Sequence, residues 1–247
     1  MIGVIIAVTG PAESAFAGKR DKTTTTKVKT EPTAVSVLRP VGSPVLSDGE
    51  AAAKVRRSSL EPRPSNATAN ATVPTAAQLG AFHSHNGTGQ WGTCDFTLRA
   101  KVTGNFKGTT DEIIQWAAWK WGLPEDVLRA VAVYESNWRM DAVGDNGMSF
   151  GLTQVKNASF HAGTYPLSKN ATAFNADYHA GIVRQYFEGC STWLVDYSFN
   201  GTRYAAGDLR GAIGAWYSGD WHSNAANGYI DAVKSHHANR TWAKSGF

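Results

Sequence analysis

All nine tryptophans of this 247-residue chain lie between Trp91 and Trp242. Large aromatic side chains bury much apolar surface, so they mark the part of a chain that builds a core. From Gly18 to Arg63 the chain instead carries ten Lys and Arg against five Asp and Glu, among Thr, Pro, Ser and Ala. Such a composition buries too little apolar surface to offset the entropy cost of folding. The sequence therefore predicts a disordered basic linker over residues 18–88 and one folded domain over residues 89–247.

The first residues resemble a secretory signal. An apolar stretch over Met1–Val8 leads to Ala15-Phe16-Ala17, which has the small-x-small form of a cleavage site, although a positively charged start is missing. The apolar stretch is too short to cross a bilayer. We therefore expect a signal peptide over residues 1–17, a secreted protein and no stable membrane insertion.

The two cysteines, Cys94 and Cys190, suit an exported protein. The simplest interpretation is one disulfide between them, and two separate buried thiols are the alternative. They are far apart and have no His at ligand spacing, so a metal site is not expected. No cofactor is expected either.

The charge is unevenly distributed along the chain. From Pro64 onward, acidic and basic residues balance, so the formal net charge of +4 comes from the N-terminal part. A nucleic-acid-binding fold would carry its basic residues on the folded surface, so this class is disfavoured. The basic linker is either simply solvated or weakly attracted to an anionic surface.

Seven Asn-x-Ser/Thr triplets occur, each a possible glycosylation acceptor. In a chain this rich in Asn, Ala, Thr and Gly we interpret them as accidental. They begin at Asn66, Asn70, Asn86, Asn157, Asn170, Asn200 and Asn239.

The predicted domain is a series of helices. A capping box at Thr109 and Glu112 begins the first helix, and Gly122 ends it. Pro124 begins the second helix, because proline lacks the N–H that the first turn leaves unused. Three further helices are expected over residues 175–188, 208–217 and 223–237, with a loop over 143–155 and a short extended piece over 152–155. The fold class is mainly α, with a small extended insertion.

One carboxylate continues the apolar stripe of the second helix. Val127, Val131 and Glu135 lie four residues apart, on one helix face. Burial disfavours the charged form of a carboxyl group, so the pKa of Glu135 is expected to be raised, which suits a general acid. Trp138 is a candidate for the apolar wall beside it. The alternative is a Glu that ends the helix and points at solvent.

The loop after Glu135 is rich in glycine and neutral polar residues. Gly144, Gly147 and Gly151 permit turns and a close approach of the backbone to a ligand. Ser149 and Gln154 suit hydroxyl and acetamido groups, and the absence of Lys and Arg from residues 144–154 argues against a phosphate loop. An ordinary turn-rich connection is the alternative.

The run Glu135-Ser136, followed by Gly147-Met-Ser-Phe-Gly-Leu-Thr-Gln154, resembles the signature of the soluble lytic transglycosylases and goose-type lysozymes. Later segments fit in order: Asn175 with its helix, then IGAWYSGDW and GYIDAVK. The resemblance covers roughly residues 111–235 and implies a lysozyme-like fold.

Carried over by position, the resemblance implies Glu135 as the single catalytic acid/base. It also implies substrate-binding roles for Ser149, Gln154, Asn175 and Tyr217. Where the family often has Asn after that Tyr, this chain has Ser218.

The implied activity is cleavage of the β-1,4 bond between N-acetylmuramic acid and N-acetylglucosamine in peptidoglycan, with formation of a 1,6-anhydro product. Such an enzyme acts at the cell wall, and the basic linker would associate weakly with anionic wall polymers. Two alternatives remain. A hydrolase of the lysozyme type needs a second carboxylate, for which Asp145 is the candidate. A glycan-binding protein would keep the cleft without the reaction.

Overall fold

The structure is a computed structural model, and it describes residues 33–85 and 98–247. Apart from residues 1–30, the chain forms one compact unit, Glu31–Phe247. The expected mainly helical fold with a small extended insertion is confirmed. The predicted signal peptide lies outside the described residues. Within the described part, no helix is long and apolar enough to cross a membrane.

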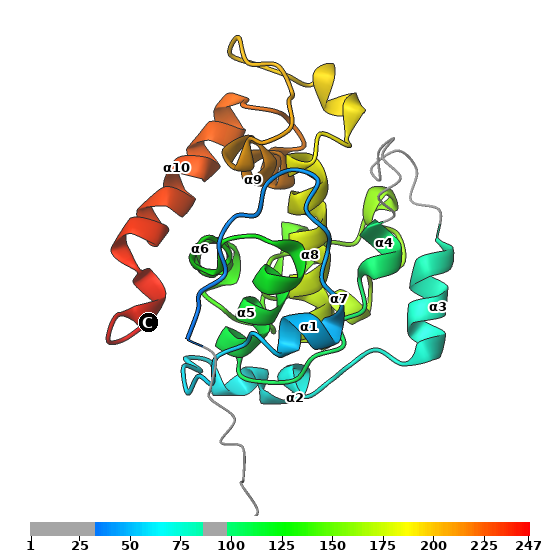
Figure 1. The fold of residues 1–247 in the computed structure, drawn as a ribbon, viewed down its shortest axis with the longest axis vertical. Coiled ribbons are helices and arrows are strands. Elements are labelled where there is room, and N and C mark those ends of the chain that lie inside the picture. The colour runs from blue at the N-terminus through cyan, green and yellow to red at the C-terminus, as the bar shows by residue number, and fades with distance from the viewer. Residues whose placement is uncertain (1–32, 86–97) are drawn as a thin grey trace, which may run out of the picture. The chain divides into compact units, whose positions relative to one another are not determined.

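Two helices form the centre of the unit. Helix α8 (Thr172–Phe187) is buried along its whole length, and α5 (Thr110–Trp121) packs along it (Figure 1). Three helices complete this core: α6 (Glu125–Ser136) packs on α5, α9 (Leu209–Ser218) packs on α8, and α10 (Asn224–Asn239) packs on both α6 and α9. The predicted helices therefore all exist, although α8 begins three residues earlier than expected.

The local signals for these helices act as expected. Thr109 and Glu112 form the reciprocal capping box of α5, and Gly122 ends that helix in the left-handed region, at φ 67°. Pro124 lies one position before α6, as its N-cap residue. Asp208 and Ser223 cap α9 and α10 through their side chains.

Short elements complete the described chain. The small sheet is antiparallel in the order β1 (Val143–Gly144), β2 (Ser149–Phe150) and β3 (Val155–Lys156). The extended piece expected over 152–155 is limited to its last residue, because residues 151–154 form the turn that joins β2 to β3. The remaining helical elements are α1 (Asp48–Ala52), η1 (Pro64–Asn66), α2 (Ala67–Asn70), α3 (Ala76–Ser84), α4 (Leu98–Lys101), η2 (Asp145–Gly147), η3 (Ser159–His161), α7 (Leu167–Asn170), η4 (Thr192–Val195) and η5 (Thr241–Ala243).

The prediction of a disordered linker is wrong for residues 33–85, which pack on the helices (Figure 1). The backbone before α1 follows α5 through hydrogen bonds from Arg39 N to Gly122 O (2.9 Å) and from Leu46 N to Lys120 O (3.0 Å). The side chain of Asp48 binds the buried ammonium group of Lys120 at 2.7 Å. Composition misleads here because the few apolar side chains of this segment, such as Leu46 and Phe82, pack on the core and the remaining attachment comes from polar bonds to the core helices.

A second ionic cluster joins the same segment to the start of α6. Arg129 is buried and binds Asp111 at 2.7 Å and Glu125 at 2.8 Å, and Arg56 binds Glu125 from the N-terminal side. The backbone N–H of Ser36 also donates to Glu125, at 3.0 Å. Buried charges need such partners, since an unpaired one is strongly destabilising.

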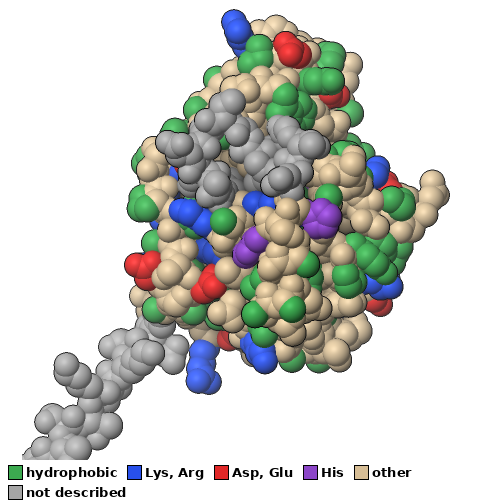
Figure 2. Space-filling model, turned by 90° about the vertical axis from the view of Figure 1, so that its right-hand side faces the viewer, with side chains coloured by type: hydrophobic (Ala, Val, Ile, Leu, Met, Phe, Trp, Pro, Cys, Tyr) green, Lys and Arg blue, Asp and Glu red, His purple; other side chains and the backbone are tan. Residues whose placement is uncertain are grey.

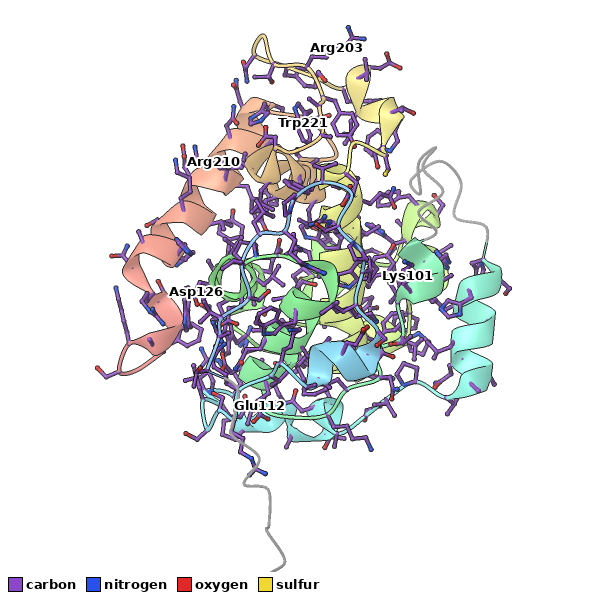
Figure 3. The ribbon with its side chains drawn as sticks, viewed as in Figure 1. Lys101, Glu112, Asp126, Arg203, Arg210 and Trp221 are labelled. Atoms are coloured by element: carbon purple, nitrogen blue, oxygen red, sulfur yellow. The ribbon has the colours of Figure 1, made fainter. Side chains whose placement is uncertain are left out.

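The C-terminal helix is anchored at both ends. Asp126 at the start of α6, labelled in Figure 3, lies 3.9 Å from Arg240 just after α10. At the other end Trp221, also labelled, is buried against the ring of Tyr204, with 4.7 Å between the centroids. Between these ends α10 packs along α6, which brings Tyr229 to the end of α6.

The two signs of charge are mixed on the face seen in Figure 2. On the visible part of the face in Figure 2, acidic and basic side chains both occur among apolar and neutral polar ones. Two of the Asn-x-Thr triplets are not accessible acceptors, since Asn66 and Asn70 are buried and donate their amide hydrogens within the fold.

Candidate active site

Glu135 lies in the last turn of α6 and is half-buried. The stripe predicted from the sequence exists, since Val131 on the same face is fully buried. The next residue, Ser136, ties the end of the helix to the following loop, because its hydroxyl donates to Leu152 O at 2.8 Å. Glu135 thus supplies the carboxyl, and the adjacent Ser136 supplies a hydrogen bond that holds the end of α6 close to the loop.

The carboxyl of Glu135 receives a hydrogen bond from a distant tyrosine. Tyr229 on α10 donates its hydroxyl to Glu135 Oε1 at 2.6 Å, and this tyrosine is only 1% exposed. The ring of Tyr217 stacks on Tyr229 with a centroid distance of 4.6 Å, and Tyr134 packs edge-on against Tyr229 at 4.8 Å. One tyrosine therefore contacts the carboxyl, and Tyr134 on α6 and Tyr217 on α9 pack on the ring of that tyrosine.

Burial raises the pKa of Glu135 from its ordinary value of 4.5 to about 7. Hydrogen bonds from Tyr229 and Trp216 oppose this by favouring the carboxylate, and the negative charge of Asp145 raises the pKa further. Burial also raises the pKa of Tyr229, so its hydroxyl stays protonated and available as a donor. A carboxyl that titrates near neutral pH can both give and take a proton.

The aromatic wall differs from the one expected. Trp138 is fully buried, donates its indole N–H to Arg129 O at 3.0 Å and packs on Phe247. The indole that favours the carboxylate of Glu135 belongs to Trp216 instead, two residues before Ser218 on α9. Local spacing suggested Trp138, but the left-handed turn after α6 directs this residue into the core.

The loop forms the second side of the site. Asp145 accepts a hydrogen bond from Ser149 at 2.8 Å and pairs with Lys156 at 3.1 Å, an arrangement that follows from the pairing of Ser149 with Lys156 across β2 and β3. These contacts lower the pKa of Asp145, so it is ionised near neutral pH. The Ser149 side chain is buried and committed to Asp145, so its predicted role is limited to holding the loop.

Gln154 folds back under the same loop. Its amide donates to Gly151 O at 3.0 Å, and a Cβ at Gly144 would overlap its side-chain oxygen. Gly144 therefore leaves room for the Gln154 side chain in this position. Gln154 is partly exposed, so it keeps a surface toward solvent, as a substrate contact requires.

The side chain of Asn175 holds the loop in place through four hydrogen bonds. Its Oδ1 accepts from Thr153 N (2.9 Å) and Oγ1 (2.8 Å), while its Nδ2 donates to Phe150 O (2.9 Å) and Ser168 O (2.7 Å). It is 0% exposed, so its predicted role as a direct substrate contact is corrected. A Cβ at Gly151 (φ 78°) would lie 2.6 Å from this amide, which explains the glycine.

Tyr217 lies at the site, as predicted, and is 49% exposed. Ser218, the departure from the family pattern, accepts the backbone N–H of Asp220 at 3.1 Å and closes the end of α9. The change from Asn therefore leaves Tyr217 in place beside Tyr229.

The predicted Cys94–Cys190 disulfide stays a prediction, because Cys94 lies outside the described residues; Cys190 is buried. Among residues 33–85 and 98–247, no group of three or more His, Cys, Asp or Glu is placed to hold a metal ion.

Sequence reasoning assigned no role beside Glu135 to Tyr134, Trp216 or Tyr229, although Trp216 and Tyr229 lie in the IGAWYSGDW and GYIDAVK segments of the resemblance. Tyr229 lies on an apolar stripe with Ala226, Ile230 and Val233, a pattern typical of core residues. The pattern indicates burial but not the direction of the hydroxyl.

Comparison with family models, with curated proteins and with solved structures found no match to this chain. The assignment of a function therefore depends on the site and on the motif resemblance.

Proposed function

We propose that this chain is a lytic transglycosylase that cleaves the β-1,4 bond between N-acetylmuramic acid and N-acetylglucosamine in peptidoglycan. The observation that carries the proposal is the environment of Glu135. Its carboxyl has a pKa of about 7, accepts a hydrogen bond from Tyr229 and lies across from a glycine-rich loop. One carboxyl with such a pKa can act first as an acid and then as a base.

In the proposed reaction, protonated Glu135 gives its proton to the glycosidic oxygen as the bond from that oxygen to C1 of the muramic acid breaks. The substrate's own acetamido group stabilises the positive charge that develops at C1. The resulting Glu135 carboxylate removes the proton of the C6 hydroxyl, whose oxygen bonds to C1 and closes the 1,6-anhydro ring. Water is not consumed.

The protein residues have separate roles in this scheme. Tyr229 orients the carboxyl, while the exposed face of Tyr217 offers an aromatic surface on which a sugar ring packs. The partner is a glycan strand of peptidoglycan, and the enzyme acts after secretion, at the cell wall.

One observation supports the hydrolase as a second candidate. The charge of Asp145 raises the pKa of Glu135, so a second carboxylate acts on the same site. Its lowered pKa makes Asp145 a weak base, which suits charge stabilisation better than activation of water. A non-catalytic glycan-binding protein would have no use for a carboxyl with this titration.

Mass spectrometry of digested cell-wall sacculi tests the proposal. The expected muropeptides are lighter by one water than reducing ends, and Glu135→Gln yields none while keeping the helical circular dichroism. Reducing muramic ends alone would identify a hydrolase, and no product at all would leave only glycan binding.

A further inference from the structure

The chain turns sharply directly after Glu135. Two consecutive residues, Asn137 and Trp138, lie in the left-handed region with φ values of 51° and 63°. This conformation costs roughly 1 kcal/mol or more for a residue other than glycine, and it persists where surrounding contacts impose it. The hydrogen bonds that end α6, from Asn137 N to Val133 O (2.9 Å) and from Trp138 N to Ala132 O (3.1 Å), hold this turn, and the N-terminal segment adds further contacts to it.

The side chain of Asn66 spans this turn. Its Nδ2 donates to Trp138 O at 2.7 Å, and its Oδ1 accepts from Met140 N at 2.9 Å. A further hydrogen bond of 3.0 Å to Thr110 Oγ1 fixes the amide against α5. Asn66 is 1% exposed, so water does not replace these bonds easily. Arg63 adds a bond of 2.7 Å to Asn137 O.

The turn after α6 also contacts the loop that carries Gln154. Met140 Sδ accepts a hydrogen bond from Leu152 N at 3.3 Å, and its methyl group lies 3.0 Å from where a Cβ of Gly151 would be. Asn66 thus holds the backbone of the residue whose side chain contacts the start of the segment that carries Gln154. This contact adds to the hydrogen bond from Ser136 to Leu152 O, which joins the end of α6 to the same loop.

We propose that Asn66 is a positioning residue for Glu135, acting through the backbone of Trp138–Met140. It makes the N-terminal segment part of the site, although this segment contributes no group to the reaction. The inference deepens the proposed function and rests on it for its effect on turnover. The effect on the titration of Glu135 does not depend on that function.

Asn70 provides a matched control. It is buried in the same segment and also donates to Thr110, at 3.1 Å, but its other hydrogen bond goes to Glu61 at 2.7 Å. Loss of its amide weakens the attachment of the segment to α5, and Asn70 itself makes no hydrogen bond to Asn137, Trp138 or Met140.

The experiment compares Asn66→Asp, Asn66→Ala and Asn70→Asp in the full chain. Asn66→Asp keeps the acceptor for Met140 N and replaces the donor to Trp138 O with an oxygen. The pKa of Glu135 is measured by NMR titration of ¹³C-glutamate, with Glu135→Gln assigning the signal. kcat, KM and melting temperature are measured in parallel.

We expect both Asn66 variants to shift the pKa of Glu135 measurably. They should also lower kcat about 10- to 100-fold with a smaller change in KM, the scale of loss that an ångström-sized misplacement causes. Asn70→Asp should lower the melting temperature while the pKa and kcat stay near wild type. If Asn66→Asp does not fold, Asn66→Ala decides alone.

The inference would be overturned if an Asn66 variant had a lowered melting temperature while its Glu135 pKa and its kcat stayed those of the wild type. A wild-type chain that cleaves no glycan would refute the proposed function, and the titration would still decide the role of Asn66.

Discussion

The hydroxyl of Tyr229 lies 2.6 Å from the carboxyl of Glu135, and the two residues are separated by 94 positions in the chain. This bond joins α10 to α6 at the point where the proposed chemistry occurs. It favours the carboxylate, whereas burial favours the protonated acid, and the balance leaves the pKa of Glu135 at about 7.

Replacing Tyr229 with phenylalanine should raise the pKa of Glu135, because the variant loses a bond that favours the charged form. A hydrogen bond to a charged group contributes about 1.5 kcal/mol or more, so a rise of about one pKa unit is expected. The alkaline limb of the pH profile of kcat should shift to higher pH by a similar amount. Tyr197→Phe, an exposed tyrosine outside the site, is the control. An unmoved limb would show that this bond does not tune the acid.

Glu135→Gln should stabilise the fold at alkaline pH while abolishing activity. The pKa of Glu135 is about 7 in the folded state against an ordinary value of 4.5, so between these values the folded state binds more protons than the unfolded state. Its contribution to the free energy of unfolding therefore falls as pH rises through this window, by about 3 kcal/mol in total. The free energies of unfolding of the wild type and of Glu135→Gln, measured with urea, should therefore diverge from pH 5 to pH 8. A constant difference between the two over this range would contradict the raised pKa.

Asp145→Asn should separate the two reaction types. Removing this charge lowers the pKa of Glu135, by less than about one unit since Asp145 is largely exposed. If the chain is a transglycosylase, anhydro products persist and the alkaline limb shifts slightly to lower pH. Asp141→Asn, an exposed carboxylate 4.0 Å from Arg139, is the control. Loss of turnover in the Asp145 variant alone would favour the hydrolase.

A chain beginning at residue 31 should unfold cooperatively, and one beginning at residue 89 should not. The shorter chain lacks Asp48 and Arg56, which pair with Lys120 and Glu125, and it also lacks Asn66. Leaving buried charges short of partners costs several kcal/mol, comparable with the whole stability of a domain. Denaturant titration followed by tryptophan fluorescence measures this. Equal midpoints would mean that residues 31–88 are dispensable.

Local signals were sufficient for most of the helical core. The capping box of Thr109 and Glu112, the left-handed Gly122 and the cap at Asp208 act over three or four residues, so their effect is readable from spacing. The placement of Glu135 on an apolar stripe was readable for the same reason, since helix periodicity decides which face is buried.

The N-terminal segment was misjudged because its bonds are non-local. Residues 33–85 carry few large apolar side chains, and composition registers only apolar burial. Their stabilising partners, such as Glu125 for Ser36 and Trp138 O for Asn66, lie more than 70 positions away. The segment does carry local helix signals, the capping boxes of Ser47 with Glu50 and of Thr75 with Gln78, but nothing local indicates the distant partners.

The sequence by itself determined the five core helices, most of their ends, the carboxyl on an apolar stripe and the glycine-rich turn after it. Only the tertiary structure decided that Tyr229 and Trp216, and not Trp138, interact with that carboxyl. The same holds for Asn175, whose side chain is buried and hydrogen-bonded to the loop. Periodicity determines which side of a helix is buried. The direction of a hydroxyl or an amide depends on which helices meet, and that is decided by packing across the whole unit.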